Sequence, residues 1–247
     1  MTTAKKRAAW TLGALVAASA ALAALAFSPL ADVERVDVVG LHHLTLDEVS
    51  DTLGFEPGDA LVRLDLGAAA AALRGLPWVA DARLTRTWRG VVTVAVTEHR
   101  PAALTLRSDE RWVLVSATGR VLTEPLAAPP ALPRLSGLRA AGKPGTHLEE
   151  HADALLAVVA ALAPAAPATP PGGRPAVEVE SLWRDRRGDI RVNLATGDLA
   201  TIGDDSELPA KVAALTTVLE RLEQAGDAAV PREIDVSVPH LPVVRRR

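Results

Sequence analysis

The segment HLEEH, His147–His151, matches a known metal-binding pattern in this sequence. Two His residues four positions apart lie on one face of a helix, where a neighbouring Glu could assist a bound Zn²⁺ in hydrolysis. Such a site also needs a third ligand and ordered partners for the ligands. The apolar face of the expected helix begins only at Leu148 and Leu155, so we interpret the segment as a solvated first helical turn. A metallohydrolase using His147 and His151 remains the alternative.

The other residues with catalytic potential do not form a motif. The acidic pairs Asp109–Glu110 and Asp204–Asp205 fall in predicted turns, without a nearby His or Ser cluster for acid–base chemistry. The six His residues are scattered, and Gly172–Gly173 lies in a Pro-rich stretch that cannot cradle a phosphate. The chain has no Cys, which excludes thiol catalysis, disulfides and zinc-thiolate sites. We therefore predict no catalytic residue, no cofactor-binding or metal-binding residue, and no enzymatic activity.

The composition favours small strand-rich modules. Hydrophobic residues make up 49% of the 247 residues, yet aromatic residues make up only 3%, so the core must consist mainly of Val, Leu and Ala. Three of the 27 basic residues precede position 8 and all 30 acidic residues follow position 31. Residues 32–247 thus carry 24 basic and 30 acidic groups, a net charge of −6, which argues against nucleic acid as a partner.

The N-terminus predicts a single membrane-spanning helix. Positive charges at 5–7 precede an uncharged stretch at 10–30, whose 21 residues would measure about 30 Å as a helix, one hydrocarbon thickness. The positive-inside rule places residues 1–9 in the cytoplasm and the rest outside. A cleaved signal peptide is the alternative, because Ala24–Phe27 resembles a cleavage site; the chain would then be an exported soluble binding module. The residues expected to form the anchor are Trp10, Leu12, Leu15, Val16, Leu22, Leu25 and Phe27.

Residues 31–101 predict a small module of one strand, two helices and two strands. The segment 33–40 alternates apolar and polar residues. Thr45 and Glu48 have the capping-box spacing of a helix that ends at Gly54, and Asp65 can cap a second helix that ends at Gly75. Strands are expected at Val79–Thr87 and Val91–His99, with a turn at Trp88–Gly90.

Residues 102–244 predict a second, β-rich domain with flanking helices, so the fold class is α+β. A helix is expected from His147, a flexible loop at 164–175, and a helix capped by Ser206 that stops at Gly226. The remaining segments are expected as two short strand regions (102–108 and 111–124), a connector (Leu132–Leu138), three strands between 176 and 203, a strand at Ile234–Val238, a short stub at Leu241–Val244 and a basic tail (245–247).

Neither predicted sheet can close on itself. Open sheet edges bind added strands from partners, and little chain remains after the last strand to cover its edge. This points to strand addition as the mode of action. The candidate partner-binding residues are Ile234, Asp235, Val236, Ser237, Val238, Leu241, Val243 and Val244.

One stretch resembles a known family. LPWVADARLTRTWRGVVTVAVTEHRPAAL, residues 76–104, is similar to the signature of the FtsQ/DivIB family of bacterial cell-division proteins, which carry a POTRA domain. The segments VERVDVVG, GDALVRLDL, VSATGRVL, LPRLSG, IDVSVPHLPVV, and GDLATIG followed by a helix with Lys211, support the match. Arg89, His99 and Ser116 depart from the usual pattern. The signature residues are Gly40, Pro77, Trp78, Val79, Trp88, Glu98 and Pro101.

The resemblance implies a non-enzymatic scaffold of the division machinery. Its expected order is a cytoplasmic tail (1–9), a transmembrane helix (10–30), a POTRA domain (31–101) and a β domain (102–244). Expected partners are division proteins of the FtsL and FtsB/DivIC type and septal peptidoglycan synthases, bound outside a plasma membrane at the septum. The partner edge would lie on the last two strands. A POTRA-bearing outer-membrane assembly factor is disfavoured, because a downstream barrel needs at least eight long strands.

Overall fold

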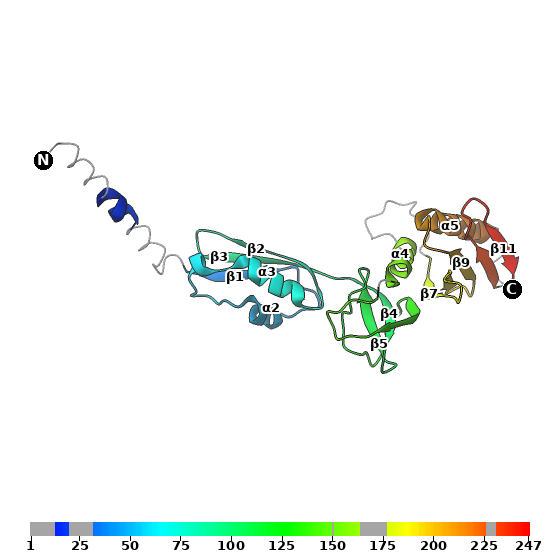
Figure 1. Cartoon of the computed structure of the whole chain (residues 1–247), viewed down its shortest axis with the longest axis horizontal. Helices are drawn as coiled ribbons and strands as arrows, with labels where there is room; N and C mark the ends of the chain where they lie inside the picture. The colour runs from blue at the N-terminus through cyan, green and yellow to red at the C-terminus, as the bar shows by residue number, and fades with distance from the viewer. Residues whose placement is uncertain (1–12, 20–31, 150, 164–176, 226–230) are drawn as a thin grey trace. The chain divides into compact units, whose positions relative to one another are not determined.

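The computed structural model describes residues 13–19, 32–149, 151–163, 177–225 and 231–247. The chain divides into two compact units, Met1–Glu98 and His99–Arg247, each with its own hydrophobic core (Figure 1). Residues 13–19 are helical, and Leu15 and Val16 in this helix are exposed. The other anchor residues, Trp10, Leu12, Leu22, Leu25 and Phe27, lie outside the described ranges. Within those ranges no helix has both the length and the apolar character to cross a membrane, so the anchor stays a prediction.

The first unit contains a three-stranded sheet with two helices. Its elements are β1 (Arg35–Val39), α2 (Leu46–Leu53), a short 3₁₀ turn η2 (Leu61–Arg63), α3 (Leu66–Gly75), β2 (Val79–Arg86) and β3 (Val91–Glu98). The sheet order is β1-β3-β2, with β1 parallel and β2 antiparallel to the central β3. The predicted order of one strand, two helices and two strands is confirmed.

Local signals set the two helices of this unit. At α2 both halves of the capping box form: the Glu48 amide donates to the Thr45 hydroxyl, and the Thr45 amide donates to the Glu48 carboxylate. Gly54 ends the helix with φ of 72°, a conformation that suits Gly. The Asp65 carboxylate accepts the Ala68 amide and caps α3. The buried Val49, Leu53, Ala69 and Leu73 of these helices belong to the same core as Val92, Val94 and Val96 of β3.

The second unit is built on one eight-stranded sheet. Its elements are β4 (Pro101–Arg107), β5 (Trp112–Ser116), β6 (Arg134–Ala140), α4 (Ala152–Leu162), β7 (Val179–Arg184), β8 (Ile190–Leu194), β9 (Leu199–Gly203), α5 (Leu208–Gln224), β10 (Arg232–Asp235) and β11 (Val243–Arg246). The strand order is β11-β10-β9-β8-β7-β6-β4-β5. Helices α4 and α5 lie against the sheet (Figure 1), and their apolar residues share its core.

Several expected elements of the second unit differ in the structure. The segment Leu132–Leu138, expected as a connector, contributes most of β6, which pairs in parallel with β4 and β7. The helix expected from His147 begins at Ala152. Ser206 does not cap α5, because its hydroxyl donates to the Asp204 carboxylate at 2.6 Å and Glu207 occupies the cap position. The loop 164–175 and Gly226 lie outside the described residues.

The C-terminal strands also correct the expected boundaries. The strand expected at Ile234–Val238 runs from Arg232 to Asp235, and the stub expected at Leu241–Val244 is a strand from Val243 to Arg246. Arg245 and Arg246 pair with Glu233 and Arg232, so they do not form a free basic tail. The antiparallel pairing with β10 therefore extends the last strand into the arginines.

Candidate partner-binding edge

Strand β11 is the outermost strand at one end of the eight-stranded sheet. It pairs with β10 in the antiparallel register Arg232↔Arg246 to Asp235↔Val243, whereas β10 also pairs in parallel with β9. The backbone of β10 is therefore occupied on both sides. Of the two strands predicted as a partner edge, only β11 has a side along which no strand of the described residues pairs.

The direction of the β11 backbone groups follows from one hydrogen bond. The Arg247 amide donates to the Pro231 carbonyl at 3.0 Å, one step beyond the Arg232↔Arg246 pair. In an antiparallel pair, residues alternate between those that bond to the partner strand and those that face away. Residues 243, 245 and 247 thus bond toward β10. Val244 directs its amide and carbonyl toward the open edge.

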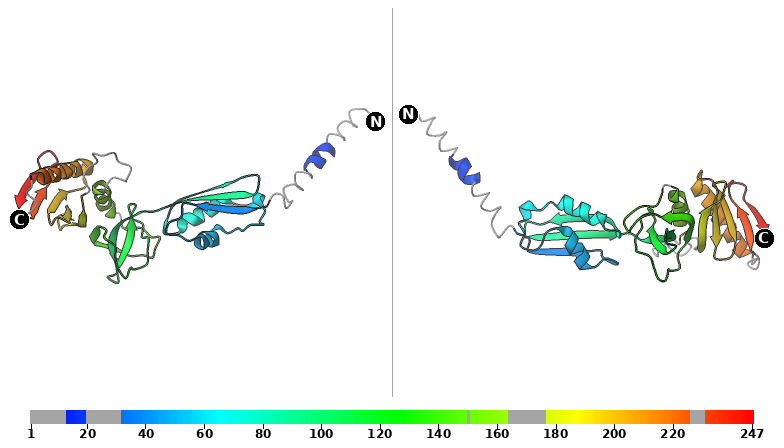
Figure 2. Two further views of the ribbon diagram at one scale, coloured as in Figure 1. Left: turned by 180° about the vertical axis from the view of Figure 1, so that it is seen from behind. Right: turned by 60° about the horizontal axis from the view of Figure 1, so that its bottom comes forward.

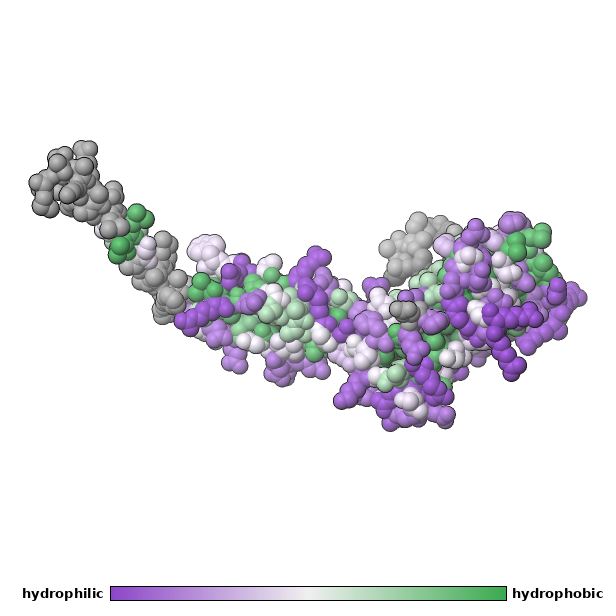
Figure 3. Space-filling model, in the orientation of Figure 1, coloured by the Kyte–Doolittle hydropathy of each residue, from purple (hydrophilic) through white to green (hydrophobic). Residues whose placement is uncertain are grey.

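Exposed apolar side chains accompany this edge. Among the described residues, Val238, Leu241, Val243 and Val244 are exposed by 40 to 68% of their surface. All four lie in the β10–β11 hairpin, at the C-terminal end of the second unit, and the space-filling view shows apolar surface there (Figure 3). Exposed apolar side chains next to unpaired backbone are typical of a protein-binding site.

The other predicted edge residues have structural roles. Ile234 and Val236 are fully buried, and the Val236 amide donates to the Thr201 carbonyl at 2.9 Å. The Asp235 carboxylate accepts both the amide and the hydroxyl of Ser237, at 2.9 and 2.7 Å, which begins the turn of the hairpin. These residues position β11 but do not face the edge, so a proline at Val236 would disrupt the sheet and would not test the edge.

A tightly packed corner supports the base of this hairpin. Gly203 ends β9 with φ of 83°, and a Cβ atom there would lie 2.9 Å from the Ser237 Cβ. The next residue, Asp204, binds the buried Lys211 ammonium through its carboxylate at 2.5 Å and its carbonyl at 3.1 Å. The hydrogen bonds from Lys211 and Ser206 lower the pKa of Asp204 to about 2. The corner thus holds α5 and the hairpin to the end of β9.

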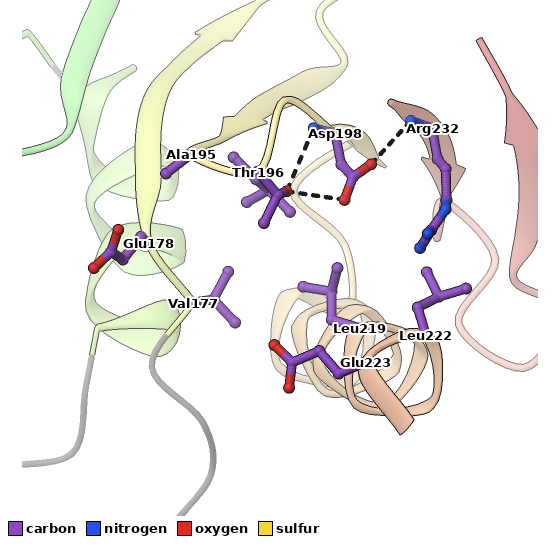
Figure 4. A pocket seen from close by; sticks show the side chains of 10 residues that line it. Val177, Glu178, Ala195, Thr196, Asp198, Leu219, Leu222, Glu223 and Arg232 are labelled. Atoms are coloured by element: carbon purple, nitrogen blue, oxygen red, sulfur yellow. Dashed lines mark hydrogen bonds between the residues drawn. The ribbon is translucent and has the colours of Figure 1, made fainter. Parts of the chain in front are cut away.

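A cavity of about 350 Å³ lies elsewhere in the second unit, between α5 and the strand ends (Figure 4). Leu219 and Leu222 line one side, while Asp198 lies opposite, next to Arg232. The Asp198 carboxylate accepts the Thr196 hydroxyl and the Arg232 amide, both at 2.9 Å. Asp198 is thereby used to fix the start of β10. No further chemistry is assigned to this cavity.

The HLEEH segment has no metal-site geometry. His147 forms a β-bridge with Arg120, and His151 precedes the first residue of α4, so the two rings do not lie one turn apart on a helix. Nowhere in the described parts of the chain do three His, Asp or Glu side chains meet in an arrangement that could hold a metal ion.

The signature residues take different places in the structure. Gly40, Trp78 and Glu98 surround the loop after β1: the His43 ring stacks on Trp78 at 4.0 Å, and its Nδ1 lies 2.9 Å from the Glu98 carboxylate. Val79 is buried in β2. By contrast, Trp88 is 82% exposed at the β2–β3 turn, with the Arg89 guanidinium over its ring. Pro77 precedes β2, and Pro101 is the first residue of β4 in the second unit.

Burial alone would raise the pKa of Glu98, but hydrogen bonds from the backbone amides of His42, Leu44 and His43, and from the His43 ring, lower it to about 2. Sequence reasoning treated His42 and His43 as scattered residues and missed this role. The signal available was their position two and three residues after the signature Gly40.

Comparison with known proteins agrees with this architecture. A family model described as "POTRA domain, FtsQ-type" matches residues 31–99. Relatives named "Cell division protein FtsQ" match more of the chain: the protein from Zymomonas mobilis is 26% identical over 87% of this chain, and the one from Mycolicibacterium smegmatis is 27% identical over 90%. The chain is therefore similar to FtsQ cell-division proteins over most of its length. A further family member, from Anaeromyxobacter sp. strain K, is 43% identical over 31% of the chain.

The matched part of each relative is shorter than the relative itself. It covers 61% of the Zymomonas protein, 59% of the Mycolicibacterium protein and 26% of the Anaeromyxobacter protein. The chain thus spans less than two thirds of these family members. The model match includes β1 to β3, so the first unit is a POTRA domain of the FtsQ type.

Proposed function

We propose that the chain is a non-enzymatic scaffold for cell division that binds other division proteins by adding a strand of theirs to β11. The observation that carries the proposal is the outward-facing backbone of Val244 next to four exposed apolar side chains of the same hairpin. Main-chain hydrogen bonds supply affinity in such complexes, and side-chain pockets supply specificity. Similarity to FtsQ cell-division proteins supports division proteins as the class of partner.

The proposed partners are membrane-anchored coiled-coil proteins of the FtsL and FtsB/DivIC type. Through them the chain would link early and late division proteins and help control septal peptidoglycan synthases. The chain itself would be a single-pass protein of the plasma membrane, with residues 1–9 in the cytoplasm and both units outside, concentrated at the septum. Confinement to one membrane raises the effective concentration of the partners, so a short edge strand can suffice.

The edge is tested by Val244→Pro. Proline removes the outward amide but none of the hydrogen bonds toward β10, and edge strands tolerate proline. We expect co-purification of the FtsL- and FtsB-type partners from solubilised membranes to fall about ten-fold, which corresponds to about 1.4 kcal/mol. The matched variant Val244→Thr keeps the amide and the β-branched shape, and should bind as the unmodified chain does. Undiminished capture by Val244→Pro would refute the proposed edge.

The same purification tests the anchor. Mass spectrometry of the N-terminal peptides should recover intact Met1–Arg7 together with the membrane partners. A mature chain that begins near Phe27 and carries no membrane partner would instead indicate a cleaved, exported binding module.

A further inference from the structure

The POTRA sheet has its own open edge at β1. Strand β1 pairs with β3 and with no other strand of the described chain, and the right-hand view of Figure 2 shows it in blue at one side of the sheet. The edge belongs to the first unit, so it is a different surface from β11.

The hydrogen bonds of β1 show which of its backbone groups face outward. The Arg35 amide donates to the Gly90 carbonyl, and the parallel register continues from Arg35↔Val91 to Val39↔Ala95. Alternate residues of a strand in a parallel pair bond to the partner, so Val36 and Val38 present their amides and carbonyls to the other side. Within the described residues these outward groups have no hydrogen-bond partner. They are therefore available to a further strand.

A groove of about 880 Å³ runs along this edge. Val36 and Val38 line it from β1, and Leu46, Ser50 and Leu53 line it from α2. One end is closed by the turn after α2, where the Val33 amide donates to the Asp59 carbonyl and the Gly58 amide to the Val33 carbonyl, both at 2.8 Å. The groove lining is mixed, polar and apolar, and it places the apolar side chains of Val36, Val38 and Leu46 beside unpaired strand backbone. Unpaired backbone and neighbouring side-chain contacts are the two elements of a strand-binding site.

The charges around the groove select the occupant. Four acidic residues line it: Glu34, Asp51, Glu56 and Asp59. The one basic residue in its lining, Arg35, is already bound by the Asp37 carboxylate at 2.7 and 3.0 Å. An acidic rim next to partly buried valines complements a segment in which Lys or Arg alternates with apolar residues.

We propose that this groove binds an extended, basic segment of a partner protein as a fourth strand of the POTRA sheet. The segment pairs its backbone with Val36 and Val38, directs its apolar side chains toward Leu46 and Leu53, and directs its basic side chains toward Asp51 and Glu56. With β11 in the other unit, the chain then has two separate places where a partner strand can add.

The proposal is tested with the full chain in detergent and a fluorescent peptide of alternating Lys and Val residues. A peptide of the same length with Glu in place of Lys is the comparison. We expect the basic peptide to bind at least about ten-fold more tightly than the acidic one, with affinity that falls as salt is added. Hydrogen exchange of the Val36 and Val38 amides should slow when the basic peptide binds.

Two kinds of variant separate the contributions of backbone and charge. Val38→Pro removes an outward amide, and the double variant Asp51→Lys with Glu56→Lys reverses the rim charge; each should weaken binding at least about ten-fold. Val38→Thr, which keeps the amide, and Asp47→Lys, an exposed position on α2 outside the groove, should stay near the unmodified affinity. If Val38→Pro does not fold, binding of the basic peptide by the double variant Asp51→Lys with Glu56→Lys tests the proposal. Equal binding of the two peptides, absence of binding by the basic peptide, or full binding by the folded variants would overturn the proposal.

Discussion

Glu98 shows how one signature residue holds a loop in place. Its carboxylate accepts the amides of His42 and His43 at 2.8 Å and of Leu44 at 3.1 Å, and its side chain is only 5% exposed. A carboxylate that accepts several backbone amides is stabilised in its charged form. The acidic residue of the TEHRP segment therefore ties the end of β3 to the loop between β1 and α2.

The Glu98→Gln variant should lose this stabilisation. A hydrogen bond to a charged group contributes about 1.5–3 kcal/mol to stability. We therefore expect Glu98→Gln to lower the free energy of unfolding by about 2 kcal/mol at neutral pH, measured by denaturant unfolding. Because the pKa is about 2 in the folded chain and about 4.5 when unfolded, the contribution is complete above pH 4.5 and disappears as the pH falls toward 2.

The pH series provides the control for this effect. The stability difference between the unmodified chain and Glu98→Gln should shrink between pH 4.5 and 2. The same series measured on Glu56→Gln, a change at an exposed position, provides the matched control variant. A difference that stays constant across this range would show that Glu98 acts through packing and not through its charge.

Gly40 is required by a close approach of two backbones. It has φ of 90°, and a Cβ atom at this position would clash with the Val96 carbonyl oxygen. Gly54 has a similar φ of 72° but no atom within 4 Å of its Cβ position. Gly54→Ala should therefore lose only about 1 kcal/mol for the backbone conformation, whereas Gly40→Ala should lose at least about 2 kcal/mol more. Equal losses in thermal unfolding would contradict the clash.

At the scale of the elements, adjacent strands β10 and β11 differ in their tolerance of proline. Val236 follows β10, is fully buried and donates its amide to Thr201, so Val236→Pro should destabilise the second unit by about 3 kcal/mol or more. Val244→Pro leaves the β10–β11 hydrogen bonds intact and should cost less than about 1 kcal/mol. Denaturant unfolding of both variants checks this contrast. A large loss for Val244→Pro would mean that its amide faces β10.

At the scale of the whole molecule, the two cores have no residue in common. Leu73 is fully buried in the first and Leu215 in the second. Each Leu→Ala change should lower the stability of its own unit by about 3 kcal/mol. Hydrogen exchange of the full chain in denaturant should show the loss in one unit only, because the two residues belong to separate cores with no shared partner. Protection lost in both units after a single change would show that they unfold together.

Much of this fold was predictable from sequence because the signals were local. The capping box at Thr45 and Glu48, the Asp65 cap and the alternation of β3 each depend on residues close in the chain, and all three are present in the structure. The three strands β7 to β9 were likewise expected from their turns and alternation. The β-α-α-β-β order of the POTRA domain followed from these signals together with its family signature.

Other features depended on partners far along the chain. Arg134–Ala140 becomes a strand because β4 and β7 flank it, and Ser206 turns from the helix cap to Asp204, which also binds Lys211. Ile234 in β10 does not face an open edge, because β9 and β11 pair with β10 on both sides. The sequence of β10 would look the same if one of these neighbours were missing, so sequence alone could not show which strand forms the edge. The sequence by itself determined most of the local elements of the POTRA domain and the similarity to FtsQ proteins. Only the tertiary structure decided the edges, because an edge is defined by the absence of a neighbouring strand.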